Sequence, residues 1–480
     1  MNHKLVLKII GLIVLIEAAF MLLPVAVALI YSEKEVFHFL AVIGINLLIG
    51  VPLSLLKIKR KTMFAKDGFF VVAMAWIIFS ALGALPFVIS GYIPNYIDAL
   101  FETVSGFTTT GASIMTDVEV LPRCLTFWRS FTNWIGGMGI LVFMLALTSL
   151  TGGSSVHLLR AESTGPTVEK MTPKLSTTAK HLYLIYIGIT ALEIILLSFD
   201  MPLFDAITTS IANAGTGGFA IYNSSIGGYS AYAQVVITVF MFVFAVNFGI
   251  YFLIFTGKLR QVLKNEELWV YLGIIFASIT IITANIMGSG LFSSFGEALR
   301  HVAFQVATVM STTGFSTTDF NLWPELSKAL LVLLMFIGAC AGSTAGGIKI
   351  SRIIIAVKAT LQDIRLTIHP RNVKSVRLNG KPVNQEIVNR TVKFIMCYII
   401  IFVVSVLIVS FDNFDFTTSF TAVAATLNNI GPGLSKVGPT GNFSEFSALS
   451  KIVMTLDMLI GRLEIYPIMI LLMPRNWKAK

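Results

Sequence analysis

Ten long apolar segments limit what this chain can fold into more than any other feature. Each holds about 20 predominantly apolar residues, the length at which a helix crosses a bilayer core about 30 Å thick. Of the 480 residues, 55% are hydrophobic and only 12% are charged, against about 25% charged in a soluble domain. We therefore expect an all-α polytopic membrane protein. The predicted spans are 5–31, 36–56, 68–90, 125–150, 181–199, 231–256, 268–288, 326–348, 391–411 and 446–473.

The distribution of basic residues predicts the orientation of the chain. Counting Lys and Arg in alternate loops places 27 of the 35 on one side of the membrane, and such an excess marks the cytoplasmic side. We therefore expect both termini in the cytoplasm, and the net charge of +10 needs no nucleic-acid partner. Lys4 and Lys8 precede the first apolar segment, but no small-residue cleavage site follows it. We interpret this segment as a retained helix rather than a cleaved signal peptide.

The polar residues favour neither an enzyme nor a disulfide framework. Cys124, Cys340 and Cys397 are odd in number and lack the spacing of a metal site, so packing is the better interpretation. No zinc-protease, hydrolase or paired-cysteine motif is present, and the six histidines are scattered. His301 opens a short apolar stretch, where we expect a capping or outer-mouth role rather than catalysis.

Four shorter apolar stretches lie between certain spans, at 98–109, 205–216, 301–312 and 415–429. All four fall on the outer side by the charge count and end in small residues, Thr and Gly. Apolar stretches of about 10–14 residues are too short to cross a bilayer and are typical of re-entrant segments. Each is expected to form a half-helix followed by a loop.

The glycines that end these stretches reveal an internal repeat. Gly111, Gly218 and Gly314 each follow the opening residue of their stretch by thirteen positions, whereas Gly431 follows Asp415 by sixteen. A repeated unit of span, half-helix, loop and span determines the whole fold. We expect two extra N-terminal helices and four helix–pore loop–helix repeats, arranged pseudo-fourfold around one pore per subunit. The predicted boundaries are 1–60 for the extra helices and 61–156, 157–262, 263–365 and 366–480 for the repeats.

The four loops are candidates for a cation pathway. Non-helical backbone at membrane depth persists only where it is buried in protein or lines a water-filled path. Loops around a common axis can satisfy their carbonyls with a dehydrated cation, and glycine can adopt the positive φ that turns carbonyls inward. The preceding half-helices would aim their negative C-terminal ends at the pore. Close packing of small residues is the alternative, but four loops in register favour the pore.

The predicted span 326–348 is interrupted at 338–347, where ten residues include four glycines. Each glycine costs about 1 kcal/mol relative to alanine inside a helix, so we expect the helix to unwind there. One interpretation is a tightly packed, kinked helix. The other is a mobile intramembrane loop below the pore loops that gates conduction.

Arg462 lies inside the last predicted span, where insertion of a charge costs at least ~2.5–3.5 kcal/mol. Asp457 or Glu464 could neutralise it structurally, or it could face the pore near the gate and oppose the passage of cations. The long cytosolic segment 349–393 carries ten cations and two acids. Lipid headgroups are the ordinary partners of such a segment.

The most specific motifs resemble the Trk/Ktr/HKT superfamily of potassium transporters, over nearly the whole chain. They are 105–112 (SGFTTTGA), 133–139 (NWIGGMG), 341–349 (AGSTAGGIK) and 461–466 (GRLEIY). The two extra N-terminal helices, together with 160–162 (RAE) and 170–173 (KMTP), resemble the TrkH branch.

The resemblance implies a potassium-selective uptake subunit in the cytoplasmic (inner) membrane of a prokaryote. It also implies a homodimer that works with a cytosolic nucleotide-binding regulator of the TrkA type, which could dock on segment 349–393. K⁺ would be the transported ion, without an organic cofactor. The implied K⁺ ligands are Thr109, Thr110, Gly111, Thr216, Gly217, Gly218, Thr312, Thr313, Gly314, Asn429, Ile430 and Gly431. The implied gate comprises Gly342, Ser343, Thr344, Ala345, Gly346, Gly347 and Arg462.

The resemblance also implies selectivity for K⁺ over Na⁺, which depends on the glycine at the same position of each loop. In this superfamily a serine in place of the first-repeat glycine accompanies sodium permeation, and all four positions are glycine here. The second and fourth loops depart from Thr-Thr-Gly, so backbone ligands are expected there. A H⁺- or Na⁺-coupled symporter remains the alternative, since such proteins also use broken helices and repeats. Glu17 and Glu193 are the isolated acids that such coupling could use, but no path to either is evident.

Overall fold

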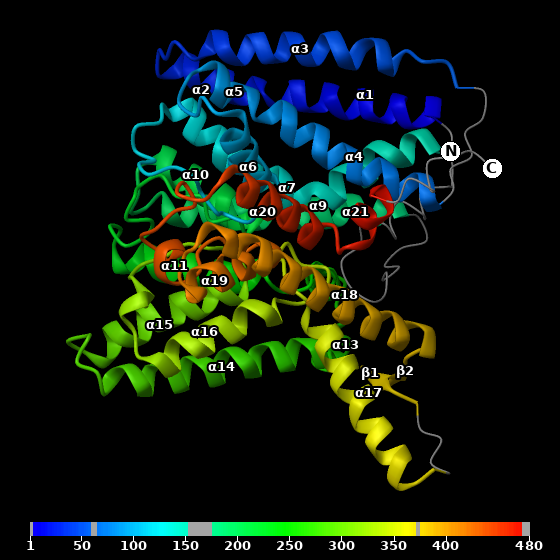
Figure 1. Ribbon diagram of the computed structural model, residues 1–480, viewed down its shortest axis with the longest axis vertical. Coiled ribbons are helices and arrows are strands. Elements are labelled where there is room, and N and C mark those ends of the chain that lie inside the picture. Colours follow the sequence, from blue (N-terminus) through cyan, green and yellow to red (C-terminus); the bar gives the residue numbers. More distant parts are fainter. Residues whose placement is uncertain (1–2, 59–64, 152–174, 371–374, 473–480) are drawn as a thin grey trace.

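The computed structural model describes residues 3–58, 65–151, 175–370 and 375–472. Long helices lie side by side in an elongated bundle, and α17 leans out of it at one corner beside a small β-hairpin (Figure 1). The hairpin consists of β1 (Arg377–Leu378) and β2 (Lys381–Pro382), which pair antiparallel. The helices with eight or more residues are α1 (His3–Phe20), α2 (Leu22–Ile30), α3 (Val36–Ser54), α4 (Ala65–Gly83), α6 (Tyr96–Phe107), α7 (Arg123–Thr151), α9 (Leu175–Leu197), α10 (Leu203–Gly215), α11 (Ala231–Phe244), α12 (Phe248–Phe255), α14 (Glu266–Met287), α15 (Phe295–Met310), α16 (Glu325–Ile337), α17 (Ile350–Ile368), α18 (Gln385–Val409), α19 (Phe416–Leu427) and α20 (Ala448–Arg462). Shorter helical segments are α5 (Leu85–Ile89), α13 (Leu259–Leu263), α21 (Tyr466–Leu471), η1 (Phe320–Leu322), η2 (Ser410–Asp412) and η3 (Ser435–Val437).

The first three helices form a hairpin along one edge of the bundle (Figure 1). Gly11 of α1 and Gly50 of α3 let the two backbones approach closely, because a Cβ at either position would lie less than 3.0 Å from the opposite helix. Small residues serve this purpose between membrane helices. The hairpin agrees with the two extra N-terminal helices expected from the sequence.

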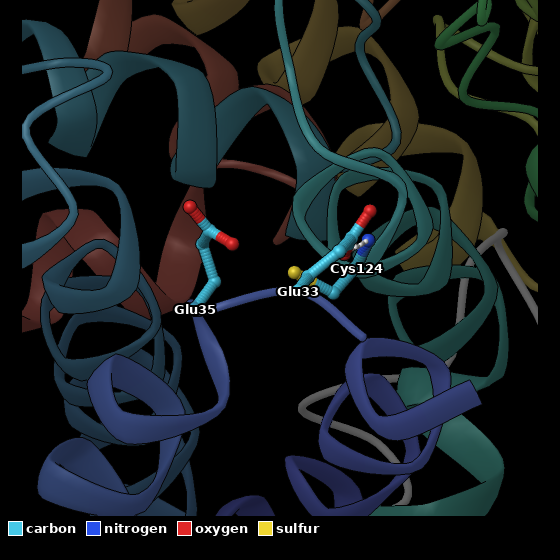
Figure 2. A group of neighbouring side chains, drawn as sticks. All are labelled: Glu33, Glu35 and Cys124. Carbon is cyan, nitrogen blue, oxygen red and sulfur yellow. Dashed lines mark hydrogen bonds between the residues drawn. The ribbon is translucent and has the colours of Figure 1, made fainter. Parts of the chain in front are cut away.

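The turn between α2 and α3 caps another helix. At the start of α7, Glu33 accepts a hydrogen bond from the backbone nitrogen of Arg123 at 2.7 Å. It accepts another from the backbone nitrogen of Cys124 at 2.9 Å (Figure 2). The first N–H groups of a helix lack intrahelical partners and favour a negative charge. Glu33, Glu35 and Cys124 bring ligand atoms within 4.8 Å of one another. Because both Glu33 oxygens accept backbone N–H groups, helix capping explains this cluster.

Six helices in the described residues are long and apolar enough to cross a membrane. They correspond to six of the ten predicted spans, and α11 with α12 makes a seventh if this bent pair counts as one. The predicted span 125–150 falls within the single helix α7. The chain therefore has the helices of a multi-pass membrane protein.

The expected interruption of the segment 326–348 is confirmed. Helix α16 ends at Ile337, and α17 begins only at Ile350. The prediction of two other uninterrupted spans is wrong. The segment 231–256 bends by 89° between α11 and α12, and 446–473 breaks after Arg462, where Glu464 and Ile465 have positive φ.

The four short stretches do form short helices, namely α6, α10, α15 and α19. The capping role expected for His301 is wrong. Helix α15 begins at Phe295, and Ser294 caps it by accepting a hydrogen bond from the Glu297 nitrogen at 3.2 Å. His301 lies inside the helix, buried, with Nδ1 2.9 Å from Thr317 Oγ1.

Candidate ion pathway

The loops after the four short helices share one backbone conformation. Each loop contributes three consecutive residues to the twelve predicted K⁺ ligands, and we call these three residues a triplet. The first residue of each triplet has a left-handed φ between 55° and 57°, and the third is a glycine with φ between 64° and 98°. Non-glycine residues seldom adopt this region, so its recurrence at equivalent positions indicates a shared structural demand. The first residues are Thr109, Thr216, Thr312 and Asn429, and the third are Gly111, Gly218, Gly314 and Gly431.

The middle residue of each triplet closes the same turn. Its backbone nitrogen donates a hydrogen bond to the carbonyl five residues earlier, at the end of the short helix. The donors and acceptors are Thr110 to Ser105 (2.8 Å), Gly217 to Ala212 (3.0 Å), Thr313 to Thr308 (2.8 Å) and Ile430 to Ala425 (2.9 Å). The fourth repeat has a longer interval between its opening residue and its glycine, but its loop forms the same turn as the other three.

Each loop also lies against the next one. A Cβ added at any of the four glycines would lie less than 3.0 Å from the carbonyl oxygen of a neighbouring middle residue. The contacts run from Gly111 to Gly217, from Gly218 to Thr313, from Gly314 to Ile430 and from Gly431 back to Thr110. All twelve predicted ligand residues thus lie in loops that touch in a closed cycle.

A cavity opens beside the four glycines. It holds about 140 Å³ and is lined by Gly111, Gly218, Gly314 and Gly431, together with residues of the outer connections. The short helices end at the loops, so their C-terminal ends lie next to the loops that line this cavity. Because a helix C-terminus carries a partial negative charge, the arrangement favours a cation.

Side-chain hydroxyls around the loops mostly bind the protein itself. Thr110 Oγ1 lies 2.8 Å from Thr108 Oγ1, and Thr313 Oγ1 lies 2.6 Å from Ser311 Oγ. Thr216 Oγ1 donates to the Gly215 carbonyl at 2.6 Å. Backbone carbonyls are therefore the oxygens that the geometry leaves best placed for an ion.

The interrupting segment between α16 and α17 lies against the ends of two short helices. Thr312 Oγ1 accepts a hydrogen bond from the Gly346 nitrogen at 2.7 Å. A Cβ at Gly346 would lie less than 3.0 Å from the Asn428 carbonyl oxygen. Within the segment, Ser343 Oγ donates to the Cys340 carbonyl at 2.7 Å. The predicted gate residues are thus placed directly against the third and fourth loops.

Arg462 joins this segment to a third part of the chain. Its guanidinium donates from Nη1 to the Thr344 carbonyl at 2.6 Å and from Nη2 to the Gly136 carbonyl of α7 at 2.7 Å. The acids considered from the sequence have further partners. Asp457 Oδ1 accepts from Ser405 Oγ at 2.8 Å, and Glu464 forms an ion pair with Arg352 at 2.5 Å.

Comparison with known proteins decides the family. The sequence model of the TrkH family, which is described as cation transport protein, matches residues 35–479 of this chain. The chain belongs to the TrkH family. The Trk system potassium uptake protein TrkH of Escherichia coli (strain K12) is 34% identical over 485 residues, covering all of both proteins. TrkG, also a Trk system potassium uptake protein of that strain, is 34% identical over 476 residues, covering 98% of this chain and 97% of TrkG.

A solved TrkH structure shares the fold. The crystal structure of the potassium transporter TrkH from Vibrio parahaemolyticus matches with a TM-score of 0.89 and 31% identity, over the full length of both chains. This match confirms the mostly helical membrane fold expected from the sequence. The motifs at 160–162 and 170–173, which suggested the TrkH branch, lie outside the described residues.

The sequence reasoning missed a buried ion pair beside the loops of this TrkH family member. Arg129 Nε lies 2.6 Å from Glu102 Oε1, and both side chains are buried. Glu102 Oε2 also accepts from the Ile114 nitrogen at 2.9 Å, while Arg129 Nη1 donates to the Ala220 carbonyl at 3.0 Å. The pair thus ties together the segments that follow the first and second loops. A charged residue inside the predicted span 125–150 was the signal available in the sequence.

Proposed function

We propose that the chain is a potassium-selective uptake subunit that conducts K⁺ through the ring of four loops. The observation that carries this proposal is the closed cycle of contacts between each glycine and the neighbouring carbonyl. Carbonyl rings replace the hydration shell of K⁺ in known filters. The family description as cation transport protein and the potassium uptake named for the relatives support the same conclusion.

In this proposal the repeats at 61–156, 157–262, 263–365 and 366–480 surround one pore with pseudo-fourfold symmetry. Each triplet supplies backbone oxygens, and its glycine permits the close approach of the next loop. Selectivity for K⁺ over Na⁺ then depends on the spacing of the carbonyls, which the turn shared by the four loops holds constant. The short helices add electrostatic stabilisation from their C-terminal ends.

The segment from Gly342 to Gly347 is the proposed gate on the inner side of the ring. Its contacts with Thr312 and Asn428 support this position. Arg462 binds the carbonyl of Thr344 and places a positive charge beside the segment. Movement of the segment would have to break or carry along that hydrogen bond, so Arg462 both restrains the gate and opposes cations.

The assembly around the pore is also proposed. A homodimer with a TrkA-type cytosolic nucleotide-binding regulator is consistent with the Trk system named for the relatives. Helix α17 and the β-hairpin stand out from the bundle (Figure 1), and the segment 349–393 is strongly basic. This region is the proposed docking surface for the regulator, with both termini on the same, cytoplasmic side.

One observation keeps a coupled symporter as the second candidate. Glu193 is fully buried in α9 and accepts a hydrogen bond from Asn213 Nδ2 of α10 at 2.6 Å. A buried carboxyl next to a pore helix could exchange a proton or bind Na⁺. Uptake driven by a pH or Na⁺ gradient, in the absence of any K⁺ gradient, would favour this candidate.

The decisive experiment is uptake of radioactive rubidium into proteoliposomes that contain the purified chain, with and without the regulator. We expect external K⁺ to block uptake and equal Na⁺ to leave it unchanged. Equal block by Na⁺ would contradict the selective ring. Empty liposomes and liposomes with the Gly111→Ser variant provide the controls.

A further inference from the structure

A groove on the outside of the bundle lies between α9 and α12. It holds about 620 Å³, with walls that include Leu184, Gly188 and Leu192 on α9 and Phe252 and Phe255 on α12. A Cβ built on Gly188 meets nothing within 4 Å, so the groove is open at that point. The side chains of Leu184 and Phe255 are 64% and 77% exposed.

This groove belongs to the surface that faces the membrane. The spanning part of α9, Lys180–Leu197, is apolar but only 22% buried, the smallest share among the six spanning helices found in the described residues. An exposed apolar surface on a membrane-spanning helix contacts lipid chains rather than water. A hollow of this size left empty would forfeit the dispersion contacts of its lining, so hydrocarbon is its natural filling.

Basic residues lie next to His181 and Thr256, two lining residues of the groove, in the sequence. Lys180 precedes His181 at the start of the spanning part of α9, and Lys258 and Arg260 follow the end of α12. Lys180, Lys258 and Arg260 are all exposed. Lys264 continues the cluster, and no acidic residue occurs between 257 and 265. A cationic rim at the end of an apolar groove fits a lipid with a negatively charged headgroup.

We propose that this groove binds an acyl chain of an anionic phospholipid, whose headgroup lies between Lys180 and Lys258. The volume and apolar lining of the groove suit a chain, and the nearby positive charges select the headgroup. Phosphatidylglycerol has the required chemistry, whereas zwitterionic phosphatidylcholine with the same chains lacks the net charge.

The groove is also linked to the proposed gate. Helix α12 begins at the bend after α11, where the Phe248 nitrogen donates to the Gly342 carbonyl at 3.1 Å. Thr344 Oγ1 donates to the Phe244 carbonyl at 3.2 Å, on the other side of the bend. A lipid chain against Phe252 and Phe255 therefore holds the helix that carries one contact with the gate and adjoins the bend where the second is made. This regulatory step rests on the proposed function, whereas binding of the lipid does not.

Native mass spectrometry of the purified protein with added phosphatidylglycerol or phosphatidylcholine tests the site. We expect the wild-type protein to retain phosphatidylglycerol preferentially. Gly188→Phe, which fills the open space, should retain one fewer of these lipids, and Lys180→Gln combined with Lys258→Gln should weaken the preference. Gly273→Phe is the matched control, since Gly273 is also an exposed helical glycine with nothing within 4 Å of its Cβ.

Several results would overturn the lipid site. These are equal retention of both lipids, or no loss in Gly188→Phe relative to Gly273→Phe. Conversion of a dimer into monomers by Gly188→Phe would instead assign the groove to a second copy of the chain.

Rubidium uptake tests the link to the gate separately. Wild-type flux should rise with the fraction of phosphatidylglycerol in the liposomes, while Gly188→Phe should lose that dependence and Gly273→Phe should keep it. If the wild type conducts K⁺ selectively but its flux does not depend on the fraction of phosphatidylglycerol, the proposed link between the groove and the gate is wrong. If no variant conducts K⁺ under any condition, the proposed function fails while the binding result stands.

Discussion

Asn429 Nδ2 donates a hydrogen bond to Thr110 Oγ1 at 2.9 Å, joining residues that lie 319 positions apart in the sequence. The same amide nitrogen donates to the Met458 carbonyl of α20 at 2.9 Å. The fourth loop is thus fastened to the first loop and to the last long helix at once. In the proposed pore, this bond closes the ring where the end of the chain meets its first repeat.

Asn429→Ala should loosen the ring at this junction. The substitution removes both hydrogen bonds, and each such bond between neutral groups contributes about 0.5–1.5 kcal/mol. Alanine is also less suited than asparagine to the left-handed φ of 56° at this position. We expect a several-fold loss of K⁺ preference over Na⁺ in rubidium uptake. Asn413→Ala, at an exposed asparagine with a similar left-handed φ of 57°, is the control and should behave as wild type.

Gly111→Ser should raise Na⁺ permeation. The added Cβ would lie less than 3.0 Å from the Gly217 carbonyl oxygen, so one loop must move and the carbonyl spacing must change. We expect the K⁺/Na⁺ preference to fall about tenfold, which corresponds to about 1.4 kcal/mol. Competition by Na⁺ in rubidium uptake measures this change.

Gly91→Ser separates this effect from backbone strain. Gly91 has a φ of +82°, close to the +79° of Gly111, but a Cβ there meets nothing within 4 Å. Both substitutions therefore impose similar strain, and only Gly111→Ser disturbs a neighbouring loop. An unchanged K⁺/Na⁺ ratio in Gly111→Ser, or an equal change in both variants, contradicts the filter assignment.

Arg462→Ala should increase flux through the proposed gate. Each hydrogen bond from a charged group contributes about 1.5–3 kcal/mol, and the substitution removes those to Thr344 and Gly136. We therefore expect faster rubidium uptake per molecule without the regulator. Arg390→Ala, which removes a surface arginine paired with Glu386, should leave uptake unchanged. Reduced protein in the membrane, with unchanged flux per molecule, would show that Arg462 is structural.

The sequence predicted the parts of this pathway that depend on local composition. The short apolar stretches correctly predicted short helices, and the glycine enrichment at 338–347 correctly predicted a helix break. The start of α15 could also be predicted from the sequence. Ser294 and Glu297 form the capping pattern in which a serine precedes a glutamate by three positions. The expectation that this helix begins at His301 overlooked that signal.

Other features depend on contacts between distant residues and could not be predicted locally. The bend after α11 occurs in a strongly apolar run, where the Phe248 nitrogen donates to the Gly342 carbonyl at 3.1 Å. The Cys340 nitrogen donates to the Ala245 carbonyl at 3.2 Å and helps to hold that bend. The pattern of hydrophobic residues in 231–256 contains neither interaction.

The ion pair of Glu102 and Arg129 gives the last prediction, on stability. Arg129→Met leaves the Glu102 carboxylate buried without its charged partner, and breaking a buried pair in this way costs about 3–5 kcal/mol. Thermal unfolding in detergent should show a large drop in Tm. Glu386→Ala breaks an exposed pair whose side chains are 72% and 65% accessible, and such pairs contribute about 0–1 kcal/mol.

A second variant separates charge from packing at this pair. Combining Arg129→Met with Glu102→Gln removes both charges, so it should recover part of the lost stability if the unpaired carboxylate is the cause. The hydrogen bonds of Glu102 to the Ile114 nitrogen and of Arg129 to the Ala220 carbonyl are altered in the double variant as well. We therefore expect both variants to show a lower K⁺ preference than the wild type, even where the Tm of the double variant recovers. Full recovery of selectivity would mean that the pair stabilises the fold without positioning the first and second loops.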